Sequence, residues 1–155
     1  MIATKYKIDS GVGRNQSRLV SFDDALLKSG VGNYNLVRLS SILPAHCKKV
    51  DTVDLTEGSL LPIAYASISS NVEGERIVSV IGIGFPEDED KVGVIMEYSA
   101  KNISFEDAMD TLVQMIKDAF DKRHWKLKNI LKTGVYAVVG KNESCSTFAC
   151  VAEWE

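Results

Sequence analysis

The apolar runs of the chain divide it into short segments that are typical of β-strands. Residues 3–8 predict a short edge strand, and residues 35–39 alternate loosely, as in a strand that is bounded downstream by a proline. Apolar, β-rich runs predict five more strands at 60–68, 76–85, 92–98, 127–139 and 145–154. The runs 60–68 and 76–85 are separated by a short polar stretch, which predicts a β-hairpin.

Two helices are predicted from capping residues and from the spacing of apolar side chains. Ser104, followed three residues later by Asp107, has the pattern of an N-cap and precedes one long amphipathic stretch. Ser21 and Asp24 show the same pattern, with Gly30 as the end of the helix. This would place Asp23 in a first helical turn, where an acid interacts favourably with the helix dipole. Residues 9–15, with two glycines, predict a loop before this helix.

Sequential strands with short connections and two helices predict an α+β fold, largely antiparallel, with helices covering a sheet. A chain of 155 residues that is 45% hydrophobic can bury about 70% of its unfolded surface in one core. We therefore expect residues 1–155 to form a single domain.

Charge and composition argue against several kinds of partner. With 18 basic and 21 acidic residues, and no long basic run, the chain has no footprint for a nucleic acid. No stretch approaches the roughly 18 apolar residues of a membrane helix or has the core of a signal peptide, so a cytoplasmic protein without membrane contact is expected. Adjacent residues such as His46 and Cys47 rarely chelate together, and the three cysteines show no metal-binding spacing, so no metal is expected.

Ser40 and Ser41 stand where the strand at 35–39 stops. A serine at a tightly held strand end can turn its Oγ onto the carbonyl carbon of the preceding residue, provided that the oxyanion is stabilised. The peptide then becomes an ester, and elimination followed by loss of ammonia leaves a pyruvoyl group at position 41. On chemistry alone, two serines at a strand end are more simply explained as the start of an ordinary polar loop.

The surrounding residues resemble the processing site of the pyruvoyl-dependent arginine decarboxylases. The resemblance is carried by Gly30-Val-Gly-Asn33 and by Asn35-Leu-Val-Arg-Leu-Ser-Ser-Ile-Leu-Pro44. It continues through Gly58-Ser-Leu-Leu-Pro62, Ala64-Tyr65, Glu73-Gly-Glu75 and Gly93-Val-Ile-Met-Glu-Tyr98, and so covers most of the chain. One departure is Ser99-Ala100, where the family is expected to have an acidic residue and glycine.

The resemblance implies self-cleavage between Ser40 and Ser41 into fragments 1–40 and 41–155. Its cofactor would be a covalent pyruvoyl group made from Ser41, without pyridoxal phosphate, which decarboxylates L-arginine to agmatine and CO2 through a Schiff base. The family fold implies sheets stacked between helix layers, in trimers or dimers of trimers with active sites between subunits. Such an enzyme would serve polyamine biosynthesis or acid resistance.

Two carboxylates match functional positions of the family. Glu97 falls on the position of the proton donor, and the apolar residues of its strand predict burial that favours the neutral acid, although a strand end in water is the alternative. Asp23 aligns with a substrate-binding aspartate, whose carboxylate would accept two hydrogen bonds from a guanidinium, and Asp24 is its nearest rival.

Two further side chains complete the candidate set. Asn35 matches an asparagine that helps at the processing site and would donate to the oxyanion on Ser40, although it also fits a turn before a strand. Arg38 is expected to pair structurally with an acid rather than to touch substrate.

Two other functions stay open on the sequence. One is a pyruvoyl-dependent decarboxylase of another amino acid, such as histidine, and the other is a noncatalytic trimeric protein that never processes Ser40-Ser41. The joint presence of Asn35, Ser41, Glu97 and Asp23 favours an enzyme, because a scaffold has no packing need for all four.

Overall fold

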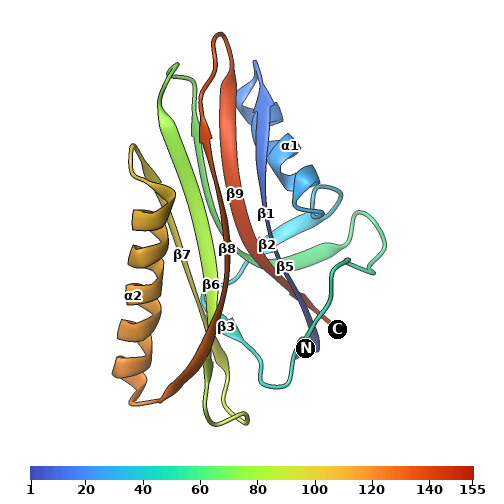
Figure 1. Ribbon diagram of the computed structural model, residues 1–155. Coiled ribbons are helices and arrows are strands. Elements are labelled where there is room, and N and C mark those ends of the chain that lie inside the picture. Colours follow the sequence, from blue (N-terminus) through green and yellow to red (C-terminus); the bar gives the residue numbers. More distant parts are fainter.

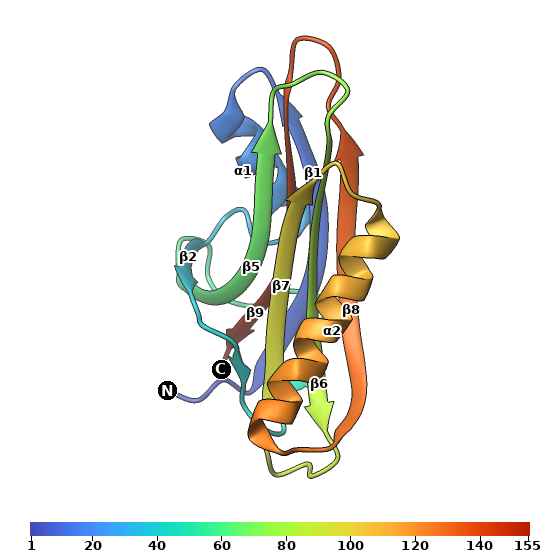
Figure 2. The same ribbon diagram turned by 90° about the vertical axis from the view of Figure 1, so that its left-hand side faces the viewer.

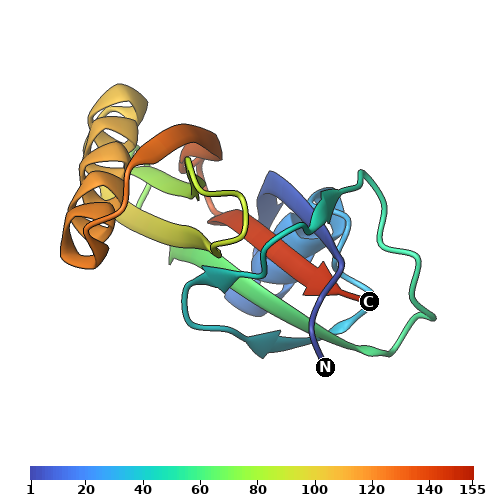
Figure 3. The same cartoon turned by 90° about the horizontal axis from the view of Figure 1, so that it is seen from below.

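The computed structural model describes residues 1–155 as two stacked β-sheets between two helices (Figure 1). The elements in chain order are β1 (Lys5–Asn15), α1 (Arg18–Lys28), β2 (Asn35–Arg38), β3 (Ile42–Leu43), β4 (Lys48–Lys49), β5 (Leu60–Ser70), β6 (Arg76–Pro86), β7 (Gly93–Lys101), α2 (Phe105–Arg123), β8 (Leu127–Val138) and β9 (Ser144–Trp154). The first sheet has the order β2-β5-β9-β1-β4 and the second has the order β3-β7-β6-β8. Seen from below, α2, the second sheet, the first sheet and α1 follow one another as layers (Figure 3). The predicted α+β fold with mostly antiparallel sheets is confirmed.

Apolar side chains fill each of the three spaces between these layers. Ala25 and Phe148 belong to the core between α1 and the first sheet. Ile83 and Val151 belong to the core between the two sheets, and Leu112 belongs to the core beneath α2. Strand β9 lies inside the first sheet, and all of its residues are buried. None of the helices is both long and apolar enough to span a membrane.

Helix α2 forms where the sequence predicts it. The Ser104 side chain accepts a hydrogen bond from the Asp107 N–H at 3.0 Å, which caps the helix. Its apolar stripe packs on β6 and β7, as Figure 2 shows with α2 in front of these strands.

Helix α1 begins one turn earlier than the sequence predicts. Its N-cap is Ser17, whose hydroxyl accepts from the Val20 N–H, and Ser21 lies inside the helix. The Ser21 hydroxyl is buried, donates to the Arg18 carbonyl at 2.7 Å and contacts the Ser146 hydroxyl. Packing against the first sheet therefore determines the register of the helix. No acid lies in its first turn, so the helix dipole does not explain Asp23.

The predicted loop at 9–15 is wrong, because β1 continues to Asn15 and pairs with β9 along its whole length. The glycines of this stretch serve the packing of α1. A Cβ on Gly13 would lie 1.9 Å from the carbonyl oxygen of Ser21, so only glycine lets the helix approach this strand.

The predicted hairpin at 60–85 is also wrong. Strand β5 pairs with β2 and β9 in the first sheet, whereas β6 pairs with β7 and β8 in the second. The short connection therefore crosses between sheets, and the apolar inner faces of β5 and β6 pack on each other.

Candidate active site

The Ser40-Ser41 bond lies in the segment that crosses from one sheet to the other. Strand β2 belongs to the first sheet and β3 to the second. On one side, the Leu39 N–H donates to the Ile63 carbonyl at 2.8 Å, and on the other the Ile95 N–H donates to the Ser41 carbonyl at 2.7 Å. Ser40 is exposed and Ser41 is half-buried. The bond is therefore anchored on both sides by different sheets.

The pairing of β3 with β7 brings Ser41 close to Glu97. Ile42 pairs with Val94, and the hydrogen bond between Ser41 and Ile95 continues this antiparallel register by one residue. Ser41 thus lies opposite Ile95, and Glu97 is its diagonal neighbour, two residues further along β7. The Cα atoms of such diagonal neighbours are about 7–8 Å apart. Residues 95 and 97 share one strand face, which is the face toward the first sheet. A substrate attached at position 41 would thus have a carboxyl group beside it.

Glu97 is ion-paired rather than surrounded by apolar residues. Its Oε1 accepts a hydrogen bond from the Arg38 Nη2 at 2.6 Å, and its side chain is 30% exposed. The expected apolar burial fails because β7 alternates, so that Val94 and Met96 pack toward α2 on the other face. The expectation that Arg38 pairs with an acid is confirmed, and its partner is the candidate proton donor itself.

The Arg38 guanidinium stacks on the ring of Tyr65, which packs on the core beneath α1. Its guanidinium carbon is 4.4 Å from the centroid of the Tyr65 ring, and its Nη2 also donates to the Tyr65 carbonyl at 2.9 Å. The Tyr65 ring packs on Phe148 at 5.2 Å between centroids, which fixes its position. The hydrogen bond to Glu97 raises the pKa of Arg38 above its ordinary value, so Arg38 is a permanent cation here.

A cavity of about 290 Å³ opens beside this ion pair. Its lining consists of Arg38, Tyr65, Ala66, Ser67, Glu97, Tyr98 and Ser99. A second hollow of about 480 Å³ shares Tyr65 and Ser67 with it and continues toward Arg18 and Phe22 of α1. The two together form a groove along β5, which runs from Glu97 to helix α1.

Asn35 lies at the far end of β2 from the serine pair. Its Nδ2 donates to the Gly58 carbonyl at 2.8 Å, and its backbone pairs with Leu60. An extended chain rises about 3.3 Å per residue, so five residues can place the backbones of Asn35 and Ser40 about 16 Å apart. Within one chain, Asn35 thus fixes the start of β2 and does not contact the Ser40 carbonyl.

Asp23 and Asp24 have different surroundings on α1. Asp24 accepts hydrogen bonds from the Arg14 N–H at 3.0 Å and from the Lys28 ammonium at 3.1 Å, and the first of these contributes most to lowering its pKa. Asp23 is exposed, and no ion pair within the chain engages it. Its helix face also exposes three apolar side chains, Leu19, Val20 and Leu27. Asp23 is therefore the carboxylate that remains available to an external group.

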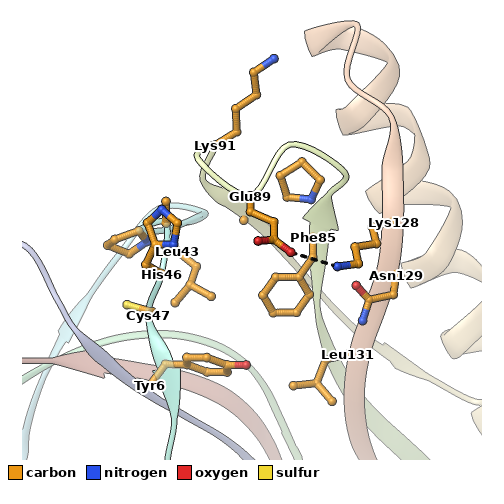
Figure 4. A pocket seen from close by; sticks show the side chains of 14 residues that line it. Tyr6, Leu43, His46, Cys47, Phe85, Glu89, Lys91, Lys128, Asn129 and Leu131 are labelled. Carbon is orange, nitrogen blue, oxygen red and sulfur yellow. Dashed lines mark hydrogen bonds and ion pairs between the residues drawn. The ribbon is translucent and has the colours of Figure 1, made fainter.

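A separate hollow of about 430 Å³ lies at the end of the sandwich near β3 (Figure 4). Tyr6, Leu43, Phe85 and Leu131 supply its apolar walls, and Lys128 pairs with Glu89 at 3.3 Å across its rim. Neither serine of the pair lines it, nor does Glu97. We call this hollow the end cavity.

His46 and Cys47, on the rim of the end cavity, are engaged in separate contacts. The His46 Nε2 lies 3.1 Å from an Asp90 oxygen, and the Cys47 thiol donates to the Ala3 carbonyl at 3.0 Å. Burial is the main cause that raises the pKa of Cys47 to about 11, so this thiol is a poor nucleophile at neutral pH. No three His, Cys, Asp or Glu side chains are arranged to hold a metal ion.

The buried acid of this molecule is Glu153, which the sequence reasoning missed. It lies on β9 opposite Tyr6, is 4% exposed, and its Oε1 has no hydrogen-bond partner. Burial raises the pKa of Glu153 to about 7. The strand pattern of residues 145–154 could have indicated this burial. Val151 faces the second sheet, and Glu153, two residues later on the same strand, points to the same side.

Comparison with known proteins assigns the chain to a family. The model of the family described as pyruvoyl-dependent arginine decarboxylase matches residues 5–153. A pyruvoyl-dependent arginine decarboxylase of Methanococcus vannielii is 37% identical over 145 residues, which cover 94% of this chain and 87% of the relative. Its counterpart in Methanocaldococcus jannaschii is 39% identical, covering 94% and 86%, and that of Pyrococcus abyssi is 41% identical over 116 residues, covering 74% and 72%. With this match, and with a serine pair held beside a carboxylate, the chain belongs to the pyruvoyl-dependent arginine decarboxylase family.

Proposed function

We propose that the chain cleaves itself between Ser40 and Ser41 and then decarboxylates L-arginine to agmatine and CO2. Family membership supports the reaction and its covalent pyruvoyl cofactor. The observation that carries the proposal for these residues is the hydrogen bond between Ser41 and Ile95, which holds Ser41 on the strand of Glu97. A group made from Ser41 would therefore form next to a proton donor.

The geometry favours cleavage without separation of the fragments. The anchors at Leu39 and Ser41 restrain the backbone on both sides of the bond, which lowers the entropy lost when the Ser41 Oγ attacks the Ser40 carbonyl carbon. After cleavage, fragment 1–40 keeps β1 paired with β9 and β2 paired with β5. Fragment 41–155 keeps the remaining strands and α2. The two fragments share the first sheet and the apolar cores on both of its faces, which holds them together.

The polypeptide then supplies position and a proton. A pyruvoyl group provides the carbonyl that accepts the electrons released when CO2 leaves. Glu97 is proposed to deliver a proton to the substrate α-carbon, and this requires its ion pair with Arg38 to open. Asn35 is proposed to act in processing as a positioning residue, because its bond to Gly58 fixes the start of β2 and thereby the place of Leu39 on Ile63.

Substrate recognition is proposed to involve a second copy of the chain. Asp23 is free to take a guanidinium, since a carboxylate can accept two charge-assisted hydrogen bonds from its planar fork. It lines neither of the two hollows that form the groove along β5. The apolar residues exposed around it, the exposed Val37 and Ile42 near the serine pair, and the exposed Leu60 at the other end of β2 are suited to burial between subunits. We infer a trimer, or a dimer of trimers, with sites between subunits.

The proposal is tested with Ser41→Ala and with a substrate analogue. Ser41→Ala removes the attacking hydroxyl and should abolish cleavage and agmatine formation together. A fully active, uncleaved Ser41→Ala protein would end the mechanism. Competition between arginine and citrulline tests the identity of the substrate, because citrulline has an uncharged group in place of the guanidinium. Equal binding of the two would show that no carboxylate reads guanidinium and would favour a different amino acid.

A further inference from the structure

The cavity beside Glu97 has one cation in its lining, and cleavage would create a second carboxylate at Ser40, two residues from that cation. Arg38 is the one basic side chain in its lining, and in the uncleaved chain it neutralises Glu97 across 2.6 Å. In the cleavage route above, the peptide first becomes an ester between the Ser40 carbonyl and the Ser41 Oγ. The Cα proton of residue 41 is then removed to solvent, the C–H electron pair forms a Cα=Cβ double bond, and the Cβ–O bond breaks with its electron pair leaving as the carboxylate of residue 40. Cleavage thus adds one negative charge next to the ion pair and adds no positive charge.

The new carboxylate forms within reach of Arg38. Ser40 is exposed and follows Leu39, whose N–H is held by the Ile63 carbonyl at 2.8 Å. Residues 38 and 40 are two positions apart, so even a fully extended backbone separates their Cα atoms by only about 7 Å. An arginine side chain spans such a distance, so Arg38 can reach the chain end without any change in the sheets.

The two carboxylates then compete for one guanidinium and one proton. An α-carboxyl group has an ordinary pKa of about 3.3–3.7, whereas that of a glutamate is about 4.3. The carboxylate of Ser40 is therefore the group that more readily stays ionised, and like charges in one site disfavour each other. Around Glu97, β2 contributes Arg38, β5 contributes Tyr65, β7 contributes Tyr98, and the residue opposite on β6 is the apolar Ile81. No other charged group of the cavity changes this balance.

We propose that self-cleavage transfers Arg38 from Glu97 to the new carboxylate of Ser40, and that this transfer lets Glu97 hold the proton that it donates. The contact between Arg38 and Glu97 is thus autoinhibitory in the precursor. It keeps the proton donor charged until the cofactor has been made. Arg38 is a positioning residue in this account, and the inference rests on the proposed cleavage at Ser40.

The transfer is tested by comparing uncleaved and mature protein. Crystal structures of Ser41→Ala and of the mature wild-type protein should show the Arg38 guanidinium at about 3 Å from Glu97 in the first and from the Ser40 carboxylate in the second. The intact mass of the same samples shows whether the chain has been cleaved, and so distinguishes a failure of cleavage from a failure of the Arg38 transfer. A cleaved protein with Arg38 still on Glu97 would overturn the transfer alone, whereas a wild-type chain that never cleaves would overturn the proposed function and the transfer with it.

A solution measurement gives a second, independent readout. The carboxyl carbon resonance of Glu97, assigned from its loss in Glu97→Gln, reports whether this group is charged. At one neutral pH it should lie closer to the neutral-acid position in mature protein than in Ser41→Ala. Arg38→Met combined with Ser41→Ala removes the guanidinium without cleavage and should move the resonance in the same direction. If cleavage moves the signal and the Arg38→Met change does not, Arg38 is not the agent.

Discussion

Two glutamates on the inner faces of the two sheets have opposite environments. Glu97, on β7, is 30% exposed and paired with Arg38, whereas Glu153, on β9, is 4% exposed and has an oxygen without a partner. The buried acid is the one with the strongly raised pKa, but it lies opposite Tyr6 near the end cavity, away from the serine pair. The acid beside Ser41 is the one that a neighbouring cation holds. A raised pKa therefore does not coincide with the proposed proton donor in this protein.

The difference also indicates how each acid obtains its proton. Glu153 is protonated near neutral pH because burial penalises its charge. Glu97 remains accessible to substrate, and its carboxylate is paired with the Arg38 guanidinium. The first arrangement is fixed by the fold, whereas the second can change when a nearby bond is cut.

The largest expected effect is a difference in kcat between variants of the two glutamates. Glu97→Gln should still permit cleavage but should lower kcat by about 10²–10⁴-fold, since a positioned proton donor contributes a factor of this size. Glu153→Gln is the matched control and should leave kcat nearly unchanged, because the end cavity does not contain the serine pair. Agmatine formation by cleaved protein measures both. A large loss of kcat in Glu153→Gln, together with normal turnover in Glu97→Gln, would show that Glu153 rather than Glu97 is the proton donor.

The second effect concerns the pH dependence of stability. The pKa of Glu153 rises from 4.5 to about 7 on folding, so between these values the folded protein holds a proton that the unfolded chain releases. Its contribution is thus fully present below pH 4.5 and is lost as pH rises through about 7. At pH 8, Glu153→Gln should raise the free energy of unfolding by up to about 3 kcal/mol.

Denaturant unfolding of wild type and Glu153→Gln at pH 4.5 and pH 8 measures this difference. The two proteins should be similar at the lower pH and should diverge at the higher one. A constant difference at both values would show that Glu153 is not protonated by burial.

The third effect tests the free aspartate on α1. Asp23→Asn should raise KM for arginine by about ten- to a hundredfold, because a hydrogen bond to a charged group contributes roughly 1.5–3 kcal/mol. Its preference for arginine over citrulline should fall accordingly. Asp24→Asn is the matched control, since Asp24 is already engaged by Arg14 and Lys28. If Asp24→Asn loses the preference and Asp23→Asn keeps it, the assignment is reversed.

The smallest effect tests how closely Glu153 and Cys47 interact. Burial is the main cause of the raised pKa of Cys47, and the charge of Glu153 adds to it. Glu153→Gln should therefore speed alkylation of Cys47 at pH 8 by no more than about threefold, which corresponds to half a pKa unit. Cys145 and Cys150 are buried and serve as internal controls in the same mass measurement. A tenfold rise would show that charge, rather than burial, dominates.

The sequence predicts local structure better than the assignment of strands to sheets. Helix α2 follows from Ser104 and its apolar stripe, because both signals are local. The hairpin at 60–85 fails because alternation identifies strands but not the sheet in which each one pairs. Ser17 and Ser21 are both plausible caps, and the choice depends on contacts of Ser21 with Ser146 far along the chain.

The same limit applies to the candidate site. Motif resemblance identified Ser41 and Glu97, and their closeness then followed from the register of β3 on β7. The ion pair with Arg38 joins two sheets and could not be read from spacing. Asn35 was expected at the Ser40 carbonyl, but an extended strand of this length holds the two apart.

The central claim is that Ser41 becomes the cofactor, and the intact mass of the purified, denatured protein tests it most directly. The account predicts two fragments, one of residues 1–40 and one that begins at position 41 and is lighter by one ammonia than a chain starting with serine. A single mass for residues 1–155, unchanged after incubation at higher temperature, would contradict it.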